Sequence, residues 1–404
     1  MASVVISGDT SGAITLSAPA VAGTTTLTLP ATSGTVLQSG TTVTEAQGGT
    51  GTTVGYYGFK NRIINGAMVI DQRNAGASVT PTTDLTYTLD RYLTRLSAAS
   101  KYSVQQNAGA ITPPTGFTNY LGVTSLSAYS ISASDYFGIL QRVEGFNVSD
   151  LGWGTASAQS VTLSFWVRSS LTGTFGVTFF NSAASRAYPA TYTISTANTW
   201  EQKTVTIAGD TSGTWVTNNG IGVQITWGLG YGTSNSTTAN AWNAGTGFMA
   251  TGAVSVVGTN GATFYITGVQ LEKGSTATSF DYRPYGTELA LCQRYYWKAM
   301  NGTNQHMAGT AYYYSATEIN MAISCPMPMR ATPTLEQVTG TDFYFFTGVV
   351  DTFDGWTGLQ LSSPTTNPTQ INLYVTSGVS GTSGRAGGIR TNNASSSVAF
   401  TAEL

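Results

Sequence analysis

The chain has 404 residues, a formal net charge of −2 and only 9% charged residues. This balance excludes the basic stripe that nucleic-acid binding requires, and a hydrophobic content of 41% excludes a disordered chain. The 47 glycines, together with abundant threonine and serine, favour β-structure with many turns.

The N-terminal segment, residues 1–57, differs in composition from the rest of the chain. Met1–Thr53 contains no aromatic residue, and Ile14 and Leu16 share one parity, which is the pattern of a half-buried strand. One chain can bury little with so few large apolar groups, whereas three copies could pair strands around a common axis. We therefore predict an attachment or shaft segment followed by a Gly-rich linker at Glu45–Tyr57. The alternative is a flexible leader. The start of the chain lacks the basic and apolar regions of a signal peptide.

Residues 58–286 are predicted to form one β-sandwich of the jelly-roll type. Runs of alternating apolar and polar residues, bounded by turn residues, begin at Val161, Phe175, Val205 and Ile221. The apolar parity changes at Thr267–Gly268, where a glycine predicts a β-bulge that restores the register. No run of apolar residues approaches the about 18 that a membrane-spanning helix needs.

Residues 287–404 are predicted to form a smaller C-terminal β-module. Thr287 is expected to cap a short helix that starts at Glu288. Alternation from Val398 to the last residue predicts a paired terminal strand. The two cysteines, Cys292 and Cys325, are too few for a disulfide framework, and their pairing remains open.

Sugar binding is the chemistry that the aromatic residues suggest. An exposed aromatic ring can stack on a pyranose, while amides and hydroxyls bind its hydroxyl groups. An uncharged loop, Gly228–Gly252, carries Tyr231, Trp242 and Asn243. Trp166 and Arg168 point away from the predicted sandwich core, and Trp356 lies in a second loop. Each aromatic residue could instead contact another subunit or anchor its own loop.

Catalytic and metal sites have little support in the sequence. His306 is the only histidine, and no nucleophile-elbow sequence or metal-ligand spacing accompanies it. Carboxylates that could cleave a glycan are Asp342, Asp351 and Asp354, or Asp135 and Glu144, but sequence spacing does not show that any pair faces a cleft. We predict no enzyme activity, no metal and no cofactor.

Three segments carry a family resemblance. They are VQLEKGSTATSFDYRPYGTELALCQRYYW, which ends at Trp297, KNRIINGAMVIDQRNAG with LDRY, between Lys60 and Tyr92, and CPMPMRATPT, from Cys325 to Thr334. Together they resemble bacteriophage fibre and appendage proteins, in which a carbohydrate-binding-like jelly roll precedes a C-terminal module with a Cys-x-Arg-Tyr-Tyr pattern. The N-terminal GAITLSAPAVAGTTTLTLPATSGTVL is similar to fibre modules that lie next to the particle.

This resemblance implies an all-β virion protein that mediates host-surface adsorption, such as a tail fibre. It implies a homotrimer that contacts other virion proteins through residues 1–53 and a host cell-surface glycan elsewhere, without nucleic acid or membrane insertion. A structural head or neck fibre without receptor binding is the alternative, and a glycan depolymerase is a second one. The host, the glycan, the anchoring partner and the location on the particle remain undetermined by the sequence.

Overall fold

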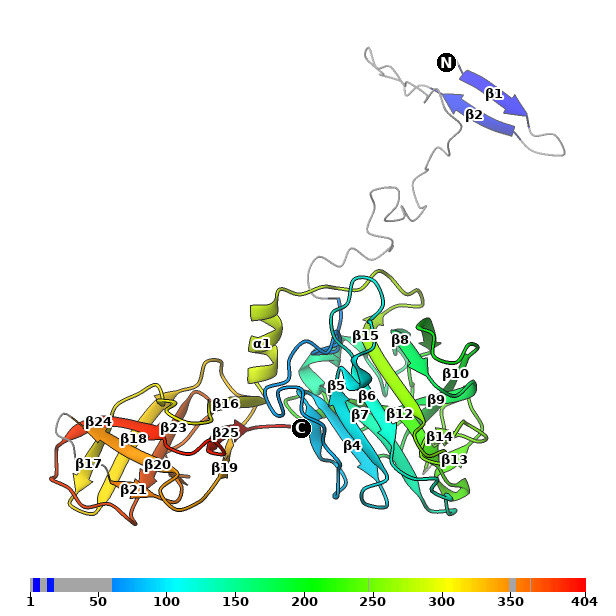
Figure 1. Ribbon diagram of the computed structural model, residues 1–404. Helices are drawn as coiled ribbons and strands as arrows, with labels where there is room; N and C mark the ends of the chain where they lie inside the picture. The colour runs from blue at the N-terminus through cyan, green and yellow to red at the C-terminus, as the bar shows by residue number, and fades with distance from the viewer. Residues whose placement is uncertain (1–2, 8–12, 18–59, 246, 349–353, 364) are drawn as a thin grey trace. The chain divides into compact units, whose positions relative to one another are not determined.

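The computed structural model describes residues 3–7, 13–17, 60–245, 247–348, 354–363 and 365–404 (Figure 1). The chain divides into two compact units, Met1–Gly55 and Tyr56–Leu404. In the first unit, strand β1 (Ser3–Ser7) pairs antiparallel with β2 (Ala13–Ser17). The predicted strand around Ile14 and Leu16 is β2. The predicted linker and the rest of the attachment segment lie outside the described residues.

Two antiparallel sheets form the sandwich, as the alternating runs predict. The six-stranded sheet has the order β10 (Ala187–Ile194), β9 (Gly173–Phe180), β12 (Ile221–Tyr231), β7 (Tyr136–Glu144), β4 (Tyr92–Leu96), β3 (Tyr87–Leu89). The five-stranded sheet has the order β11 (Glu201–Ile207), β8 (Val161–Ser169), β15 (Thr263–Lys273), β6 (Leu121–Ser125), β5 (Tyr102–Gln106). Short 3-10 helices connect some strands: η2 (Ala108–Ala110), η3 (Gly145–Asn147), η4 (Ser149–Leu151) and η5 (Thr233–Asn235).

The sandwich core lies between these two sheets. Apolar side chains at alternate positions point inward, so that Phe165 of β8, Phe175 of β9 and Trp227 of β12 are almost completely buried. Phe165 and Trp227 meet edge to face across the core, with ring centroids 5.9 Å apart. The predicted all-β fold class with a central jelly-roll sandwich is confirmed.

The predicted β-bulge lies in β15. The register between β15 and β8 shifts between Thr267 and Gln270, and Gly268 has a left-handed backbone with φ of 59°. The predicted loop at Gly228–Gly252 is shorter than expected, because β12 continues through Tyr231. Beyond it, β13 (Ser236–Thr237) pairs in parallel with β14 (Met249–Ala250).

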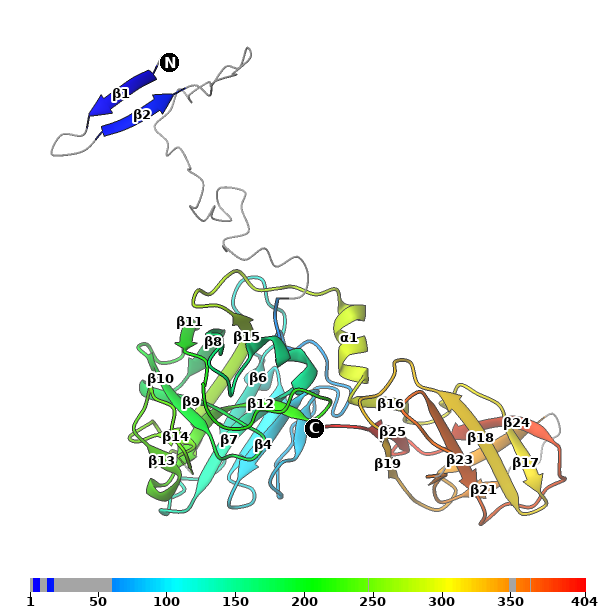
Figure 2. The same cartoon turned by 180° about the vertical axis from the view of Figure 1, so that it is seen from behind.

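The C-terminal region starts with the helix α1 (Tyr285–Gln293), which leads into β16 (Figure 2). A three-stranded sheet has the order β16 (Tyr296–Asn301), β25 (Ser397–Thr401), β19 (Thr334–Val338). A seven-stranded sheet has the order β21 (Gly355–Trp356), β20 (Tyr344–Gly348), β24 (Ala386–Thr391), β17 (Ala311–Ser315), β18 (Glu318–Ser324), β23 (Gln370–Val375), β22 (Gln360–Leu361). The predicted terminal strand is β25, which pairs on both sides.

The predicted start of helix α1 is wrong. The N-cap position of α1 is Pro284, and no side chain caps it. Thr287 lies inside the first turn, because the Arg283–Pro284 step ends the extended segment earlier than the capping pattern suggests. The Glu288 carboxylate does lie near the helix N-terminus, but it is buried and accepts a hydrogen bond from the Asn65 backbone N–H.

The sandwich and the C-terminal module belong to the same compact unit, so the predicted division after residue 286 stays a prediction. Charged pairs join them: Arg294 binds Glu144 at 2.6 Å, and Arg91 binds Glu403. Cys292 and Cys325 are both free thiols. Within the described part of the chain, no helix is long and apolar enough to cross a membrane.

Candidate functional site

The bulge in β15 brings two aromatic side chains together on the outer face of the five-stranded sheet. Trp166 of β8 lies opposite Thr267, and the sheet leaves its ring half-buried and facing outward, as predicted. A Cβ atom at Gly268 would lie 2.6 Å from Cζ of Phe117 and 3.1 Å from Cδ1 of Trp166. Both rings therefore pack on the bare backbone of the bulge, and a side chain at Gly268 would displace them.

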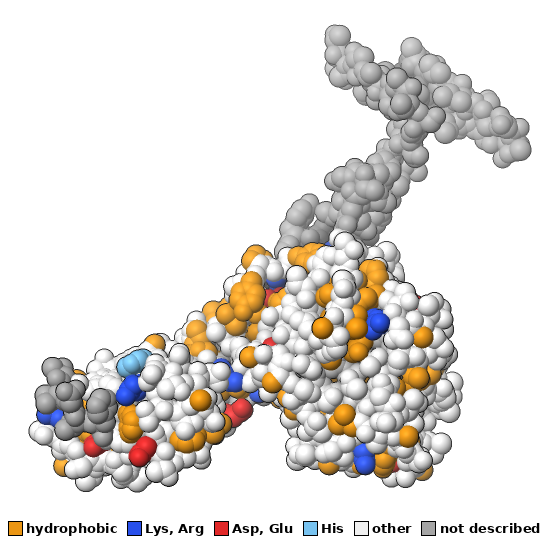
Figure 3. Space-filling model, in the orientation of Figure 1, with side chains coloured by type: hydrophobic (Ala, Val, Ile, Leu, Met, Phe, Trp, Pro, Cys, Tyr) orange, Lys and Arg blue, Asp and Glu red, His pale blue; other side chains and the backbone are white. Residues whose placement is uncertain are grey.

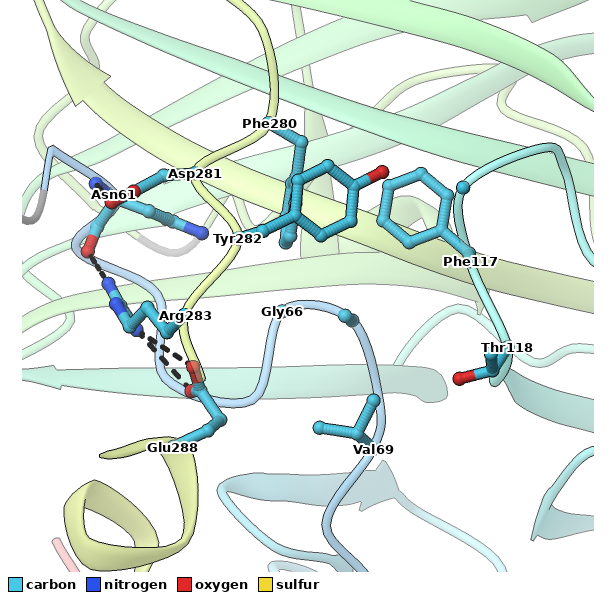
Figure 4. Close-up of a pocket in the computed structure, with 12 residues that line it drawn as sticks. Asn61, Gly66, Val69, Phe117, Thr118, Phe280, Asp281, Tyr282, Arg283 and Glu288 are labelled. Atoms are coloured by element: carbon cyan, nitrogen blue, oxygen red, sulfur yellow. Dashed lines mark hydrogen bonds and ion pairs between the residues drawn. The ribbon is translucent and has the colours of Figure 1, made fainter. Parts of the chain in front are cut away.

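Phe117 also belongs to a cluster of three aromatic side chains, Phe117, Phe280 and Tyr282, which we call the aromatic wall. The Phe117 and Phe280 rings meet edge to face with centroids 5.0 Å apart, and Tyr282 lies 5.6 Å from Phe117 and 4.9 Å from Phe280. Figure 4 shows the Tyr282 and Phe117 rings side by side. Tyr282 is 58% exposed, so one end of the wall faces solvent.

A small pocket of about 120 Å³ lies against the wall and is lined also by Asn61, Val69 and Thr118. Its polar groups mostly bind each other (Figure 4). Arg283 pairs with Glu288 at 3.3 Å, and both side chains are almost fully buried. These bonds fix the shape of the pocket, so the aromatic wall is the surface that it offers to a ligand.

Uncharged polar side chains lie beside Trp166 on the same sheet face. Gln202 of β11 is directly opposite Trp166, and Thr204 is opposite Ser164. Gln202 and Thr204 are exposed. A half-buried indole next to an amide and a hydroxyl can stack on the apolar face of a sugar, while these polar groups bind the sugar hydroxyls. We call Trp166 together with the aromatic wall the outer aromatic surface.

Figure 3 shows hydrophobic side chains gathered over the part of the molecule where α1 and the end of β15 lie. Tyr282, which is 58% exposed, belongs to the segment between them. Exposed aromatic residues that cluster in this way mark an interaction surface more often than scattered ones do.

Trp242, which the sequence places in an exposed loop, is half-buried in a tryptophan cluster. Its ring lies 5.4 Å from Trp153 and 5.5 Å from Trp215, and its indole N–H donates to the Ala208 carbonyl at 2.9 Å. Asn243 donates its side-chain amide to the Ala187 carbonyl at 3.0 Å. These contacts fasten the loop to β10, and its role in ligand binding stays a prediction.

Tyr231 lies elsewhere, at the end of β12. It lines an open hollow of about 440 Å³ with Tyr129, Ser132, Thr233 and Ser255 among its neighbours. Burial raises the pKa of the Tyr231 hydroxyl. Trp242 and Asn243 do not line this hollow, and the structure therefore does not bring the three loop residues into one site.

Trp356 is not in an exposed loop, and this expectation needs correction. Its side chain is only 3% exposed and belongs to the core of the C-terminal module. The reason is a pairing of neighbouring strands that the sequence does not show: β21 pairs with β20, which places Trp356 opposite Tyr344. A buried indole offers no face to a sugar.

The candidate catalytic carboxylates of the sandwich do not form a facing pair. Asp135 and Glu144 lie at the two ends of β7, which separates them by about 30 Å at roughly 3.3 Å per residue. A glycosidase needs its two carboxylates within about 10 Å. Burial raises the pKa of Glu144, but hydrogen bonds from Arg294 and Tyr295 outweigh it and lower the pKa below its usual value. Glu144 is thus a structural partner of the C-terminal module.

Among the candidates of the C-terminal module, Asp354 is already engaged. Asp354 accepts hydrogen bonds from the Tyr313 hydroxyl and from the Ser380 backbone N–H. Asp351 lies outside the described residues. His306 is exposed. Among the residues that the structure describes, no group of three or more His, Cys, Asp or Glu residues could hold a metal ion.

Of the comparisons with known proteins, the one with solved structures finds similarity to this chain. No protein-family model matches the chain, and no curated protein matches it. An enzymatically active domain of tailspike protein 4 from bacteriophage CBA120 aligns over 53% of this chain, with 10% identity and a TM-score of 0.29. The match spans only 22% of that tailspike chain.

Two carbohydrate-binding modules align over a similar share of the chain. One is a family 11 module from Clostridium thermocellum in complex with a mixed-linked tetrasaccharide, with 10% identity and a TM-score of 0.26, over 50% of this chain and 98% of that one. The other is TmCBM61 in complex with β-1,4-galactotriose, with 11% identity and a TM-score of 0.26, over 53% and 99%. Scores this low carry no functional argument, so function must be argued from the residues of this chain.

The aromatic wall is the feature that sequence reasoning missed. Phe117 comes from a Pro-Pro-Thr-Gly-Phe turn, and Phe280 and Tyr282 alternate with polar residues in the segment before α1. That alternation, together with the bulge glycine, was a sequence signal from which the aromatic wall could have been predicted. Of the predicted residues, only Trp166 lies on the outer aromatic surface.

Proposed function

We propose that this chain is a fibre or appendage component of a bacteriophage particle, and that it adsorbs to the host surface by binding glycans. We place the contact at the outer aromatic surface of the sandwich. Residues 1–53 would attach the chain to other virion proteins in a homotrimer, with the mature protein located on the particle surface. The family resemblance of the sequence supports this assignment.

The observation that carries the proposal is the position of Trp166. Its half-buried ring lies between the uncharged Gln202 and the aromatic wall, and the wall ends in an exposed Tyr282. Such a surface suits a neutral sugar, since it provides stacking faces and neutral hydrogen-bonding groups without a desolvated charge.

Binding through this surface is expected to be weak for one chain. The surface is shallow, and the polar groups of the adjoining pocket already bind one another. Several copies on one particle can convert weak single contacts into useful avidity.

We propose binding without cleavage. The separation of Asp135 and Glu144 along β7 supports this, as does the engagement of Glu144 by Arg294. A halo of lost surface polysaccharide around purified protein spotted on a bacterial lawn would instead favour a depolymerase.

The test is adsorption of the labelled full chain to candidate host cells, before and after mild periodate oxidation of their surface sugars. We expect binding that periodate abolishes. Trp166→Ala and Tyr282→Ala should each weaken it several-fold, whereas Trp242→Ala should leave it nearly unchanged. Tyr285→Ala is the matched control, because Tyr285 is equally exposed but lies outside the wall.

Two outcomes would oppose the proposal. Absence of binding to every permissive host, at protein concentrations that reveal millimolar affinity, would favour a structural head or neck fibre. Loss of binding in Trp242→Ala with Trp166→Ala intact would move the site to the tryptophan cluster.

A further inference from the structure

The seven-stranded sheet of the C-terminal module carries a row of outward-facing side chains that no sequence pattern indicated. Strand pairing sets Tyr312 of β17 opposite Asn320 of β18, Asn320 opposite Tyr374 of β23, and Tyr374 opposite Gln360 of β22. Directly opposed residues of antiparallel strands share one face of a sheet. We call these four residues the tyrosine–amide row.

The opposite face of the same strands confirms this orientation. Tyr313, Ile319 and Val375, which neighbour the row along the strands, are all buried in the core of the module. The row therefore faces away from the core. Tyr312 is 43% exposed, Gln360 is exposed, and Asn320 and Tyr374 are half-buried.

On β17, β18, β22 and β23 the chemistry of this face is neutral and polar. Its other outward positions on β17, β18 and β23 include Tyr314, which is 62% exposed, Ala322 and Asn372. The one ionisable carboxylate among the outward positions of these strands is Glu318, at the first residue of β18. A charged ligand would find little to pair with here.

The spacing of the row fits an extended ligand. Neighbouring strands lie about 4.8 Å apart, so the two tyrosines are separated by roughly 10 Å, with an amide between them and another beyond. Two aromatic side chains at this separation can contact two nearby rings of one chain of sugars, while Asn320 and Gln360 reach the hydroxyl groups between and beyond them.

We propose that the tyrosine–amide row is a second binding site, which holds a neutral oligosaccharide running across the strands of the C-terminal sheet. This site is separate from the outer aromatic surface, and it stands even if that surface binds nothing. It replaces Trp356 as the ligand-contacting part of the C-terminal module.

A second copy of the chain is a poorer occupant. Permanent subunit interfaces are rich in apolar side chains at their centre. Apart from the tyrosines, the outward positions of β18, β23 and β22 are Glu318, Asn320, Ala322, Ser324, Gln370, Asn372 and Gln360, of which only Ala322 is apolar. Such a face offers few apolar groups for a subunit to bury.

The test uses the full-length chain and a printed array of neutral oligosaccharides, followed by calorimetric titration with the oligosaccharide that binds best. Binding is measured in a Trp166→Ala/Tyr282→Ala background, which disables the outer aromatic surface. In this background, the chain with an unmodified tyrosine–amide row is compared with a chain that also carries Tyr312→Ala and Tyr374→Ala. We expect the unmodified row to bind and the double variant to bind at least about tenfold more weakly.

Two further variants make the test specific. Asn320→Asp keeps the size of the side chain, removes its N–H donors and adds a charge, and should also weaken binding. Tyr314→Ala is the matched control, since it removes an exposed tyrosine from the same strand but outside the row. Thermal unfolding of each variant confirms that it is folded.

The proposal fails if the double variant binds the array as the unmodified row does, or if Tyr314→Ala weakens binding equally. It also fails if the double variant changes the oligomeric state in size-exclusion chromatography while no oligosaccharide binds, because the face would then be a subunit contact.

Discussion

At the residue scale, Gly268 controls the outer aromatic surface through the absence of a side chain. A non-glycine residue in the left-handed region costs about 1 kcal/mol or more, and a Cβ atom there would also overlap Phe117 and Trp166. Gly268→Ala should therefore lower the melting temperature by several degrees and weaken periodate-sensitive adsorption together.

The control for this substitution is Gly261→Ala. Gly261 has a similar φ of 73°, but no atom lies within 4 Å of its added Cβ. Gly261→Ala should therefore lower the melting temperature through the backbone cost alone and leave periodate-sensitive adsorption unchanged. Equal loss of adsorption in both variants would mean that the bulge does not position the rings.

Asp90 gives a residue-scale prediction about pH. Burial raises the pKa of its carboxyl from 3.8 to about 6, although hydrogen bonds from Gln72 and the charge of Arg73 oppose the shift. Between these two values the folded state binds more protons than the unfolded state. Asp90 therefore lowers stability as the pH rises from about 4 to 6, by about 3 kcal/mol in total.

This effect is measured by chemical denaturation of the unmodified protein and of Asp90→Asn between pH 4 and 7. Carboxylates with lowered pKa values, such as Glu144, act in the opposite direction, and the comparison cancels them. The unmodified protein should lose stability relative to the variant as pH rises. A difference that stays constant over this range would contradict the burial argument.

At the element scale, the start of α1 depends on a buried charge pair. Glu288 pairs with Arg283 and accepts a hydrogen bond from the backbone N–H of Asn65. Glu288→Ala should destabilise the protein by about 3–5 kcal/mol, because it leaves a buried guanidinium without its carboxylate. Glu336→Ala, which removes a 57% exposed carboxylate 3.9 Å from Arg73, should cost less than about 1 kcal/mol in the same denaturation measurement. Similar losses in both variants would show that burial of the pair is unimportant.

The elements also show which features the sequence could predict. Strict alternation predicts β8, β9 and β12, because one face of each strand carries large apolar side chains and the period of two is visible locally. The bulge in β15 was predictable for the same reason. The end of β12 was not, since Gly228 and Gly230 resemble turn residues although pairing with β7 continues to Tyr231.

The site residues were harder to predict, because their exposure depends on contacts between different elements. Trp356 is buried through the pairing of β21 with β20, and Phe117 meets Tyr282 across more than 160 positions of sequence. Trp166 was predictable because its outward direction follows from the alternation within β8 alone.

At the scale of the whole molecule, the C-terminal residues complete the sandwich. Glu403 pairs with Arg73 at 3.0 Å and with the buried Arg91, and the Leu404 carbonyl accepts a hydrogen bond from the Tyr87 hydroxyl at 3.1 Å. Cys292 and Tyr295 pack with Ile64 and Ile70 in a shared apolar cluster. The sandwich and the C-terminal module are therefore expected to unfold in one transition.

Glu403→Ala tests this coupling. The substitution removes the carboxylate from two guanidinium groups with 9% and 1% exposed side chains, so it should cost about 3–5 kcal/mol. Calorimetry should show one transition at a lower temperature, because Arg73 and Arg91 belong to the sandwich while Glu403 belongs to the C-terminal end. Two unfolding transitions, of which only one shifts in temperature, would mean that the C-terminal module unfolds independently of the sandwich. If the coupling holds, deleting residues 287–404 would also destabilise the sandwich, and adsorption should then be assigned by point substitutions on each surface instead of by truncation.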